Sequence, residues 1–321
     1  MVNVMTIEKI ASELKKHKSV LIFSHNRPDG DTIGSATALR LALLKLNIDA
    51  DLVCYGDIPE KLKYIKSTEF YAKSINASKK YTAYIAVDCS CEYMFPELFA
   101  QFSKHRETFN VDHHISNTRY AKYNFAVECG ACAEHVYSLI KALGVEFDSE
   151  IATCLLTGIV TDTGAFYHSN VTEQTLLTAA ALKQAGGDLQ LVIKKNFKEQ
   201  SKERAKLYAK VINKMRYRLD GKVGVLIITK EDLDECNAVA NLTEGFIDYP
   251  MTVDGVEVAL SFLETGKNRY KVSLRSKGKV NVNEIASLYG GGGHVLASGM
   301  IINGHIEDVI DKLCYNVEQR L

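Results

Sequence analysis

The first half of the chain alternates helical and strand-like patterns, and this alternation limits the folds that it can adopt. Apolar residues recur at helical spacing from Ile7 to Leu14, and the apolar run at 19–24 predicts a buried strand. Further strands are expected at 51–54, 82–87 and 108–111, and further helices at 32–46, 133–143 and 150–160. Such alternation is typical of a parallel sheet covered by helices on both faces. Ligands of these sheets bind beyond the carboxyl ends of the strands.

The pattern changes near Gly186 and Gly187. Two polar helical stretches follow, at 189–197 and 202–217, and are typical of a connector. Strands are then expected at 223–229, 256–263 and 270–274, before a closing amphipathic helix that begins near Ile306. We therefore predict an α/β protein with a parallel-sheet domain at 1–187, a helical linker at 188–215 and a smaller α/β domain at 216–321.

The composition argues against several functions. The 321 residues include 39 basic and 39 acidic side chains, and this zero net charge argues against a broad electrostatic grip on long nucleic acid. The N-terminal segment 1–9 has no apolar signal-peptide core, and no later run approaches a membrane-spanning length. We expect a cytoplasmic protein without a membrane partner, and most of its eight cysteines should stay reduced. Cys129 and Cys132 are interpreted as small residues at a strand-to-helix junction.

Three side chains of the type that bind metals follow the first strand within seven residues. These are His25, Asp29 and Asp31, all in the loop that leaves the carboxyl end of the strand. Two carboxylates and an imidazole packed so closely would cost stability unless a cation neutralised the repulsion between the carboxylates. The alternative is a polar turn in which Asp31 caps the positive end of the next helix.

Acidic or imidazole groups also follow three later apolar segments. They are Asp88, the triplet Asp112-His113-His114, and Asp162. Because the ends of parallel strands share one edge of a sheet, we expect these groups to meet the first loop in a single crevice. Carboxylates and imidazoles, with no thiolate required, suit Mn²⁺ or Mg²⁺ better than a structural zinc ion.

A run of four glycines near the C-terminus is a second candidate site. The run ends at Gly293 and His294 follows it, while Ser273 and Arg275 precede it in an expected strand. Glycines let a backbone approach a ligand and turn its N–H groups toward an anion, and arginine offers a planar fork to a phosphate. A flexible turn is the alternative. The run lacks the Gly-Lys-Ser/Thr ending of a nucleotide triphosphate loop.

Together these motifs resemble the DHH phosphoesterase family and its DHH-associated C-terminal domain. The resemblance spans residues 25–299 and is greatest to the compact members that act as nano-RNase and pAp phosphatase. It implies that one metal is held by His25, Asp29 and Asp88, and the other by Asp31, Asp88, His113 and Asp162. It also implies that Asp88 bridges the metals, that Asp112 orients a ligand imidazole, and that His114 reaches the phosphate or acts as general acid.

The same resemblance implies how substrate would be held. The residues expected to grip a nucleotide are Arg275, Ser273, Gly291, Gly292, Gly293 and His294. Asn117 and Arg119 are further candidates for a phosphate contact, with a solvated loop as the alternative. A gripping domain that faces a cutting domain would favour pieces of two to five nucleotides over long RNA.

The function predicted is therefore an exo-acting phosphodiesterase that hydrolyses short oligoribonucleotides to mononucleotides and removes the 3′-phosphate of pAp. A phosphodiesterase for cyclic dinucleotides or linear pApA is the alternative, because the same metal pair would attack either diester. From another class, a non-catalytic module that binds nucleotides or RNA remains open. We infer no obligate protein partner; the cleavage polarity stays open, as does the possibility of a homodimer.

Overall fold

The computed structural model describes residues 5–321, which form two compact units. The first unit ends at Glu199 and the second is Gln200–Leu321, so the division falls inside the segment expected as a linker. The expectation of no signal peptide rests partly on residues 1–4, which lie outside the described part. No helix among the described residues is long and apolar enough to cross a membrane.

The first unit is built on a six-stranded sheet with the order β3-β2-β1-β4-β5-β6. All of its strand pairs are parallel. The strands are β1 Ser19–Phe23, β2 Asp49–Val53, β3 Tyr71–Ala72, β4 Ala83–Val87, β5 Thr108–Asp112 and β6 Tyr123–Ala126. The chain moves outward in one direction from β1 to β3 and returns to the other side of β1 with β4. The carboxyl ends of β1 and β4 therefore flank a topological switch point, where such sheets bind ligands.

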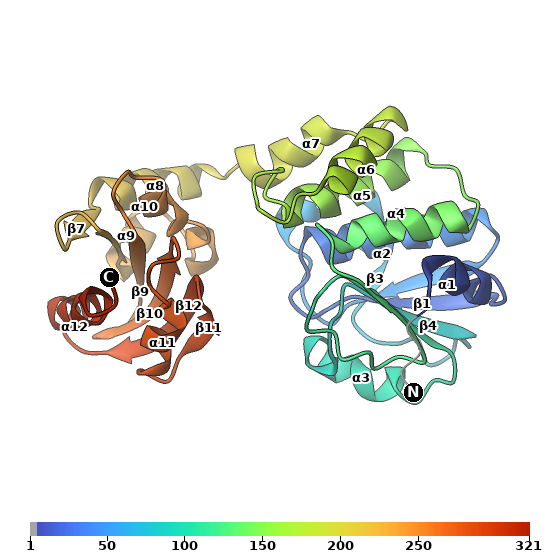
Figure 1. Cartoon of the computed structure of the whole chain (residues 1–321), viewed down its shortest axis with the longest axis horizontal. Helices are drawn as coiled ribbons and strands as arrows, with labels where there is room; N and C mark the ends of the chain where they lie inside the picture. Colours follow the sequence, from blue (N-terminus) through green and yellow to red (C-terminus); the bar gives the residue numbers. More distant parts are fainter. Residues whose placement is uncertain (1–4) are drawn as a thin grey trace. The chain divides into compact units, whose positions relative to one another are not determined.

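Helices cover both faces of this sheet (Figure 1). One face packs against a large apolar core that includes residues of α1, α2, α4 and α5. The other packs against a smaller core with many aromatic rings, formed with α3. The helices are α1 Ile7–Leu14, α2 Gly30–Lys45, α3 Pro96–Phe102, α4 Cys132–Ala142, α5 Ser149–Asp162, α6 Glu173–Gln184 and α7 Leu189–Ile193, with short turns η1 Glu60–Leu62, η2 Lys66–Phe70, η3 Glu92–Met94 and η4 Lys194–Lys198.

The second unit has a mixed sheet with the order β11-β12-β10-β9-β8-β7. Only β8 and β9 pair in parallel; the other pairs are antiparallel. The strands are β7 Arg216–Arg218, β8 Val223–Ile228, β9 Val258–Gly266, β10 Arg269–Ser276, β11 Gly292–His294 and β12 Ala297–Asn303. The helices are α8 Lys202–Asn213, α9 Lys230–Glu235, α10 Asp248–Met251, α11 Val282–Ser287 and α12 Ile306–Glu318, with the turn η5 Ala240–Thr243.

The two faces of this second sheet differ in character. On one face, alternate residues such as Phe262, Val272 and Leu274 form a core with α11 and α12. On the opposite face, the β8 end packs under α8 and Phe246, while Ser273 and Arg275 on β10 are only partly buried. The period-two pattern of β10 therefore directs its polar side chains to a half-open surface.

Some expected elements differ from those observed. The helix predicted at 202–217 ends at Asn213, because Arg216–Arg218 pairs with β8 as a strand. The connector residues are also shared between the units: α7 packs on α5, and α8 packs in the core formed with β8. The strands β3, β6, β11 and β12 and the helices α3, α6, α9, α10 and α11 were not predicted.

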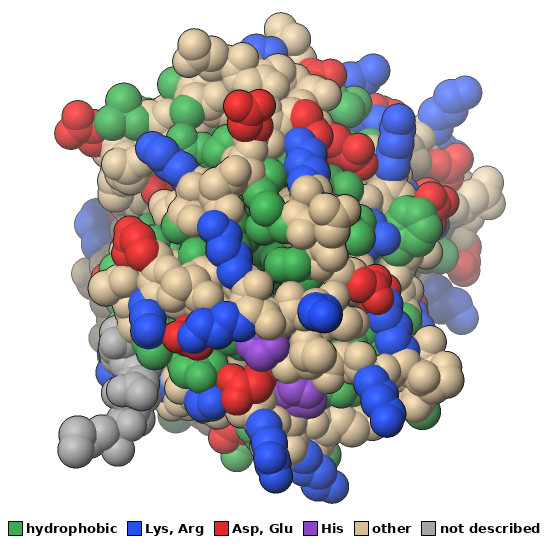
Figure 2. Space-filling view, turned by 90° about the vertical axis from the view of Figure 1, so that its right-hand side faces the viewer, with side chains coloured by type: hydrophobic (Ala, Val, Ile, Leu, Met, Phe, Trp, Pro, Cys, Tyr) green, Lys and Arg blue, Asp and Glu red, His purple; other side chains and the backbone are tan. Residues whose placement is uncertain are grey.

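Charges are mixed on the face of the molecule drawn in Figure 2. Lys and Arg side chains are interspersed there with Asp and Glu, and they do not gather into a single patch. This distribution agrees with the balanced composition of the whole chain.

Candidate metal centre

The loop after β1 and the first turn of α2 bring the three predicted residues to the carboxyl edge of the sheet. Asp31 was expected in the loop but lies in the helix, which begins at Gly30. Asp29 caps α2, where its Oδ1 accepts hydrogen bonds from the N–H groups of Asp31 and Thr32 at 3.0 and 3.1 Å. His25 is 5% exposed, and its Nε2 lies 3.8 Å from Asp29 Oδ1 and 3.6 Å from Asp88 Oδ2. These separations exceed a hydrogen bond but suit ligands around a shared cation.

Asp88 lies at the centre of the crevice, directly after β4. Its backbone has a φ of 58°, in the left-handed region that is costly for most residues and that Asp adopts more readily than most. The side chain is 2% exposed, and its Oδ1 is buried without a hydrogen-bond partner in the described part of the chain. That oxygen lies 3.5 Å from His113 Nε2. Such an oxygen needs a partner, because unpaired buried polar atoms are costly.

His113 turns its Nε2 into the same crevice. The nitrogen lies 3.6 Å from Asp162 Oδ2 and 3.9 Å from Asp31 Oδ2. The other ring nitrogen, Nδ1, lies 3.1 Å from the carbonyl oxygen of Cys129. A proton on Nδ1 donated to that carbonyl leaves the lone pair of Nε2 free for a cation.

Asp31 is held by the N-terminus of α4. Its carboxylate accepts hydrogen bonds from the N–H of Cys132 at 2.5 Å, the N–H of Ala133 at 2.9 Å and the hydroxyl of Ser35 at 3.0 Å. The residue is 1% exposed, so these donors and the positive end of the helix dipole stabilise a charge that water does not reach. The sequence did not identify these donors, since backbone N–H groups carry no residue-specific signal.

Asp162 reaches the crevice by a different route from the one expected. It was predicted to follow an apolar segment at the edge of the sheet, but it is the last residue of the helix α5. The carboxyl end of α5 is brought to the site because α5 packs closely on α2. The contact requires glycine at position 158, where a Cβ atom would lie 2.5 Å from Asp31 Oδ1.

Asp112 and His114 form a second pair beside the metal crevice. We expected Asp112 to orient an imidazole that binds metal, but its Oδ1 lies 2.7 Å from Nδ1 of His114. The amide of Asn117 donates to Asp112 Oδ2 at 2.6 Å and to Asn110 Oδ1 at 2.8 Å. Asn117 therefore holds Asp112 in place, and its amide N–H groups already donate hydrogen bonds within the protein. Arg119, the other residue predicted to contact phosphate, is exposed.

The charges in the crevice conflict in the absence of a cation. Burial and the nearby Asp88 and Asp162 carboxylates raise the pKa of Asp31 well above its usual value. Burial likewise raises the pKa of Asp162 to about 6. Burial alone would raise the pKa of Asp88, but the nearby imidazoles of His113 and His25 lower it to about 2. A divalent cation would remove this conflict by neutralising several carboxylates at once.

The donor set fits two adjacent divalent cations. Ligand atoms of His25, Asp29 and Asp88 lie within 4.8 Å of one another, and those of Asp31, His113 and Asp162 form another such group. Asp88 approaches both groups, since its Oδ2 faces His25 and its Oδ1 faces His113. Asp88, His113 and His114 form a third group. The residue types are oxygen and imidazole donors, which suit Mn²⁺ and Mg²⁺.

The glycine run of the second unit is partly explained by packing. The run was interpreted as a backbone that approaches a ligand, with a flexible turn as the alternative, but Gly291 and Gly293 lie against β12. A Cβ atom would come within 2.3 Å of the Gly299 carbonyl oxygen at position 291, and within 2.5 Å of that of Ala297 at position 293. Gly292 is exposed and its surroundings are open. His294 pairs with Ala297, which in turn pairs with Arg275, so the three share one face of the sheet.

Comparison with known proteins identifies the family. The model described as the DHH family, N-terminal domain, matches residues 19–159, and the DHHA1 domain matches residues 220–321. The chain belongs to the DHH family of phosphoesterases.

Among its relatives are proteins named bifunctional oligoribonuclease and PAP phosphatase NrnA. The chain is 33% identical to the one from Thermus thermophilus over 94% of its own length and 90% of the relative's. It is 30% identical to the one from Mycoplasma genitalium over 97% of its length and 99% of the relative's. An exopolyphosphatase-related protein from Bacteroides fragilis shares the fold, with a TM-score of 0.87, 23% identity and coverage of 97% and 95%.

Proposed function

We propose that this chain is a two-metal phosphodiesterase that hydrolyses short oligoribonucleotides to mononucleotides and removes the 3′-phosphate of pAp. The observation that carries the proposal is the unpaired, buried Oδ1 of Asp88 between two groups of metal-type ligands. The names of the Thermus and Mycoplasma relatives support the same substrates.

In this proposal one cation is held by His25, Asp29 and Asp88, and the other by Asp31, Asp88, His113 and Asp162. We propose Mn²⁺ as the cation, with Mg²⁺ or Co²⁺ as substitutes. Divalent ions in such sites supply an activated water and neutralise the phosphoryl oxygens. The groups around the ligands orient them. The Cys129 carbonyl holds the ring of His113, and the N-terminus of α4 holds the carboxylate of Asp31.

The residues beside the crevice would act on the substrate directly. Asp112 holds the ring of His114 and raises the pKa of that imidazole, and burial opposes this effect only in part. A protonated His114 can donate its proton to the leaving oxygen of the ester. Arg119 in the first unit, and Arg275 and His294 in the second, are the groups that we propose for contacts with other phosphates and the sugar.

The proposal is tested by phosphate and nucleotide release in Mn²⁺ from pAp, a 3-mer RNA, a 24-mer RNA, pApA and cyclic di-AMP. Wild type should turn over pAp and the 3-mer much faster than the 24-mer. Loss of a residue that only supports a metal ligand typically lowers metal affinity or activity by about 10–100-fold. Asp88 is proposed as a direct ligand, so Asp88→Ala should lower turnover by more than about 100-fold. Asp254→Ala, an exposed carboxylate of the second unit, is the control.

Equal product release from wild type and Asp88→Ala would reject the metal-dependent reaction. Comparable turnover of the 3-mer and the 24-mer would reject the preference for short substrates. Preferred turnover of cyclic di-AMP or pApA would replace the proposed substrates but keep the chemistry.

A further inference from the structure

The chain turns back on itself directly after Asp162. Gly164, Ala165 and Phe166 all lie in the left-handed region of backbone conformation, with φ of 57°, 57° and 69°. Two of these three residues carry side chains for which this conformation is unfavourable. Such strain persists only where the surrounding structure maintains it, and it is often found in functional segments. The result of the turn is that Asn170 returns to the end of α5.

Asn170 joins this turn to the loop that precedes α4. Its Nδ2 donates hydrogen bonds to the carbonyl oxygen of Asp162 at 3.2 Å and to that of Gly130 at 2.9 Å. Both partners are carbonyl groups, so the amide nitrogen, and not the amide oxygen, must face them. The N–H groups of one side chain therefore connect two segments that are far apart in the sequence.

Each of these two segments contributes to the same proposed cation site. Asp162 is itself a proposed ligand. Gly130 directly follows Cys129, whose carbonyl oxygen lies 3.1 Å from His113 Nδ1. The other ring nitrogen of His113, Nε2, lies 3.6 Å from Asp162 Oδ2. The Asn170 amide therefore links the main chain behind both ligands, and a shift of either segment would change the separation of Nε2 and Oδ2.

Gly130 is held in place by close contacts with α4 and α6. A Cβ atom at this position would lie 2.6 Å from Glu134 Oε1 and 2.8 Å from Thr175 Oγ1. The Thr175 hydroxyl donates a hydrogen bond to that same Oε1 at 2.9 Å, and both residues are buried. Because the loop at Gly130 is confined by these groups, a hydrogen bond to its carbonyl oxygen can fix the position of the Asn170 turn.

We propose that Asn170 is a positioning residue that sets the separation of Asp162 and His113 around the cation that they are proposed to share. It is not a ligand itself and acts through main-chain carbonyl groups. Without its N–H groups the two ligands must be ordered when the ion binds, which lowers the affinity. The ligands of the other cation, among them His25 and Asp29, come from different segments, so its affinity should not change. The inference rests on the proposed pair of cations.

The test is calorimetric titration of the metal-free full chain with Mn²⁺, for wild type, Asn170→Leu and Ser169→Ala. Leucine keeps the branched shape of asparagine but has no side-chain N–H groups, and Ser169 is an exposed neighbour that serves as the matched control. Loss of a group that orients a ligand typically lowers metal affinity about 10–100-fold. Asn170→Leu should therefore weaken one ion by about 10-fold and leave the other unchanged, whereas Ser169→Ala should bind both as wild type does.

A second readout requires no metal. The proton on His113 Nδ1 is followed by NMR in EDTA, where its exchange with water reports how firmly the Cys129 carbonyl holds the ring. One hydrogen bond changes such an equilibrium by about 2- to 12-fold, so exchange in Asn170→Leu should become faster by about this factor. Hydrolysis of pAp by the variant should also recover at saturating Mn²⁺, which a disrupted fold would not allow.

Unchanged affinity for both ions in Asn170→Leu would overturn the assigned role, and so would equal weakening of both ions together with a lower Tm. An unchanged exchange rate of the His113 proton would also overturn it. If wild type binds both ions and hydrolyses pAp while any of these results holds, only the role of Asn170 fails. If wild type binds no pair of ions, the proposed function fails, and proton exchange in EDTA still decides the role of Asn170.

Discussion

A single carboxylate links the two halves of the metal crevice. Asp88 faces His25 with one oxygen and His113 with the other, at 3.6 and 3.5 Å. Its left-handed backbone, with a φ of 58°, directs this side chain into the crevice from the end of β4. Backbone strain of this kind is often found at functional sites, where the surrounding structure maintains it. At the scale of single residues, the account therefore depends most on Asp88.

The pair formed by Asp112 and His114 leads to a prediction about pH. The hydrogen bond from His114 to Asp112 raises the pKa of the imidazole, so Asp112→Asn should lower that pKa toward its usual value. An NMR titration of the metal-free protein measures the pKa directly. If His114 is the general acid, the alkaline limb of the kcat/KM profile should move to lower pH in the variant. An unchanged His114 pKa would contradict the assigned pairing.

The sequence predicted the metal-type side chains of the crevice but not the groups that orient them. His25, Asp29, Asp31, Asp88 and His113 stood out because metal-type side chains gathered after apolar segments. The groups that orient them are the Cys129 carbonyl and two α4 N–H groups, together with a serine hydroxyl. Every residue has a carbonyl, and almost every residue has an N–H, so only the folded geometry reveals which ones matter.

At the scale of elements, the contact between α2 and α5 sets the position of two proposed ligands. Gly158→Ala should disturb it, because the added Cβ would lie 2.5 Å from Asp31 Oδ1 and 2.7 Å from the Ala133 Cβ. Overpacking of this kind costs about 1–3 kcal/mol of unfolding free energy, although alanine is otherwise the better helix former. Calorimetry should also show weaker Mn²⁺ binding. Glu150→Ala on an exposed position of α5 is the control, and a stabilised Gly158→Ala with unchanged Mn²⁺ affinity would contradict the account.

The helix α8 is attached to the second unit by ion pairs to a buried carboxylate. Asp232 is 1% exposed and lies 2.5 Å from Lys214 Nζ and 3.1 Å from Lys210 Nζ. Burial would raise its pKa, but the hydrogen bond from Lys214 and those from other neighbours lower it to about 2. A lowered folded pKa stabilises the protein above the unfolded value near 3.8, and this stabilisation is lost as pH falls toward 2.

Asp232→Asn should therefore lower the unfolding free energy by about 1–2 kcal/mol at pH 7, since hydrogen bonds to charged groups contribute at this level and exposed lysines weaken the effect. The difference from wild type should shrink as the pH falls from 4 toward 2. Urea unfolding across this range measures it. A destabilisation that is the same at every pH would show that the carboxylate charge is not the cause.

Helices and strands with a clear apolar pattern were predicted from the sequence, whereas elements that are short or have an ambiguous pattern were not. The strands at 19–23 and 83–87 lie close to their expected bounds because buried parallel strands form continuous apolar runs. The four residues of β6 are too short to show a period. The helix α8 was extended too far, because its polar pattern continues into Arg216–Arg218, which pairs with β8 only in the folded unit.

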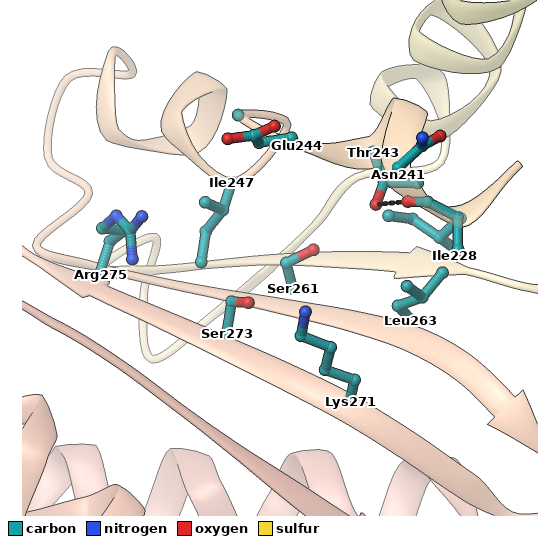
Figure 3. Close-up of a pocket in the computed structure, with 12 residues that line it drawn as sticks. Ile228, Asn241, Thr243, Glu244, Ile247, Ser261, Leu263, Lys271, Ser273 and Arg275 are labelled. Carbon is teal, nitrogen blue, oxygen red and sulfur yellow. Dashed lines mark hydrogen bonds between the residues drawn. The ribbon is translucent and has the colours of Figure 1, made fainter. Parts of the chain in front are cut away.

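At the scale of the whole molecule, two units carry separable parts of the proposed function. The first contains the crevice of metal-type ligands, and the second contains a pocket on the polar face of its sheet (Figure 3). The change of pattern near Gly186 and Gly187 predicted two domains joined by a linker at 188–215, and the structure divides after Glu199, inside that segment. The pocket itself was not predicted, since it depends on how the segment 240–247 folds over β10.

The most direct test of the central claim is anomalous diffraction from crystals of the chain grown with Mn²⁺. The account predicts two peaks about 3.5–4 Å apart, with one Asp88 oxygen bound to each. One ion should contact His25 and Asp29, and the other should contact Asp31, His113 and Asp162. No peak in the crevice, or a single ion that Asp88 does not bind, would contradict the account.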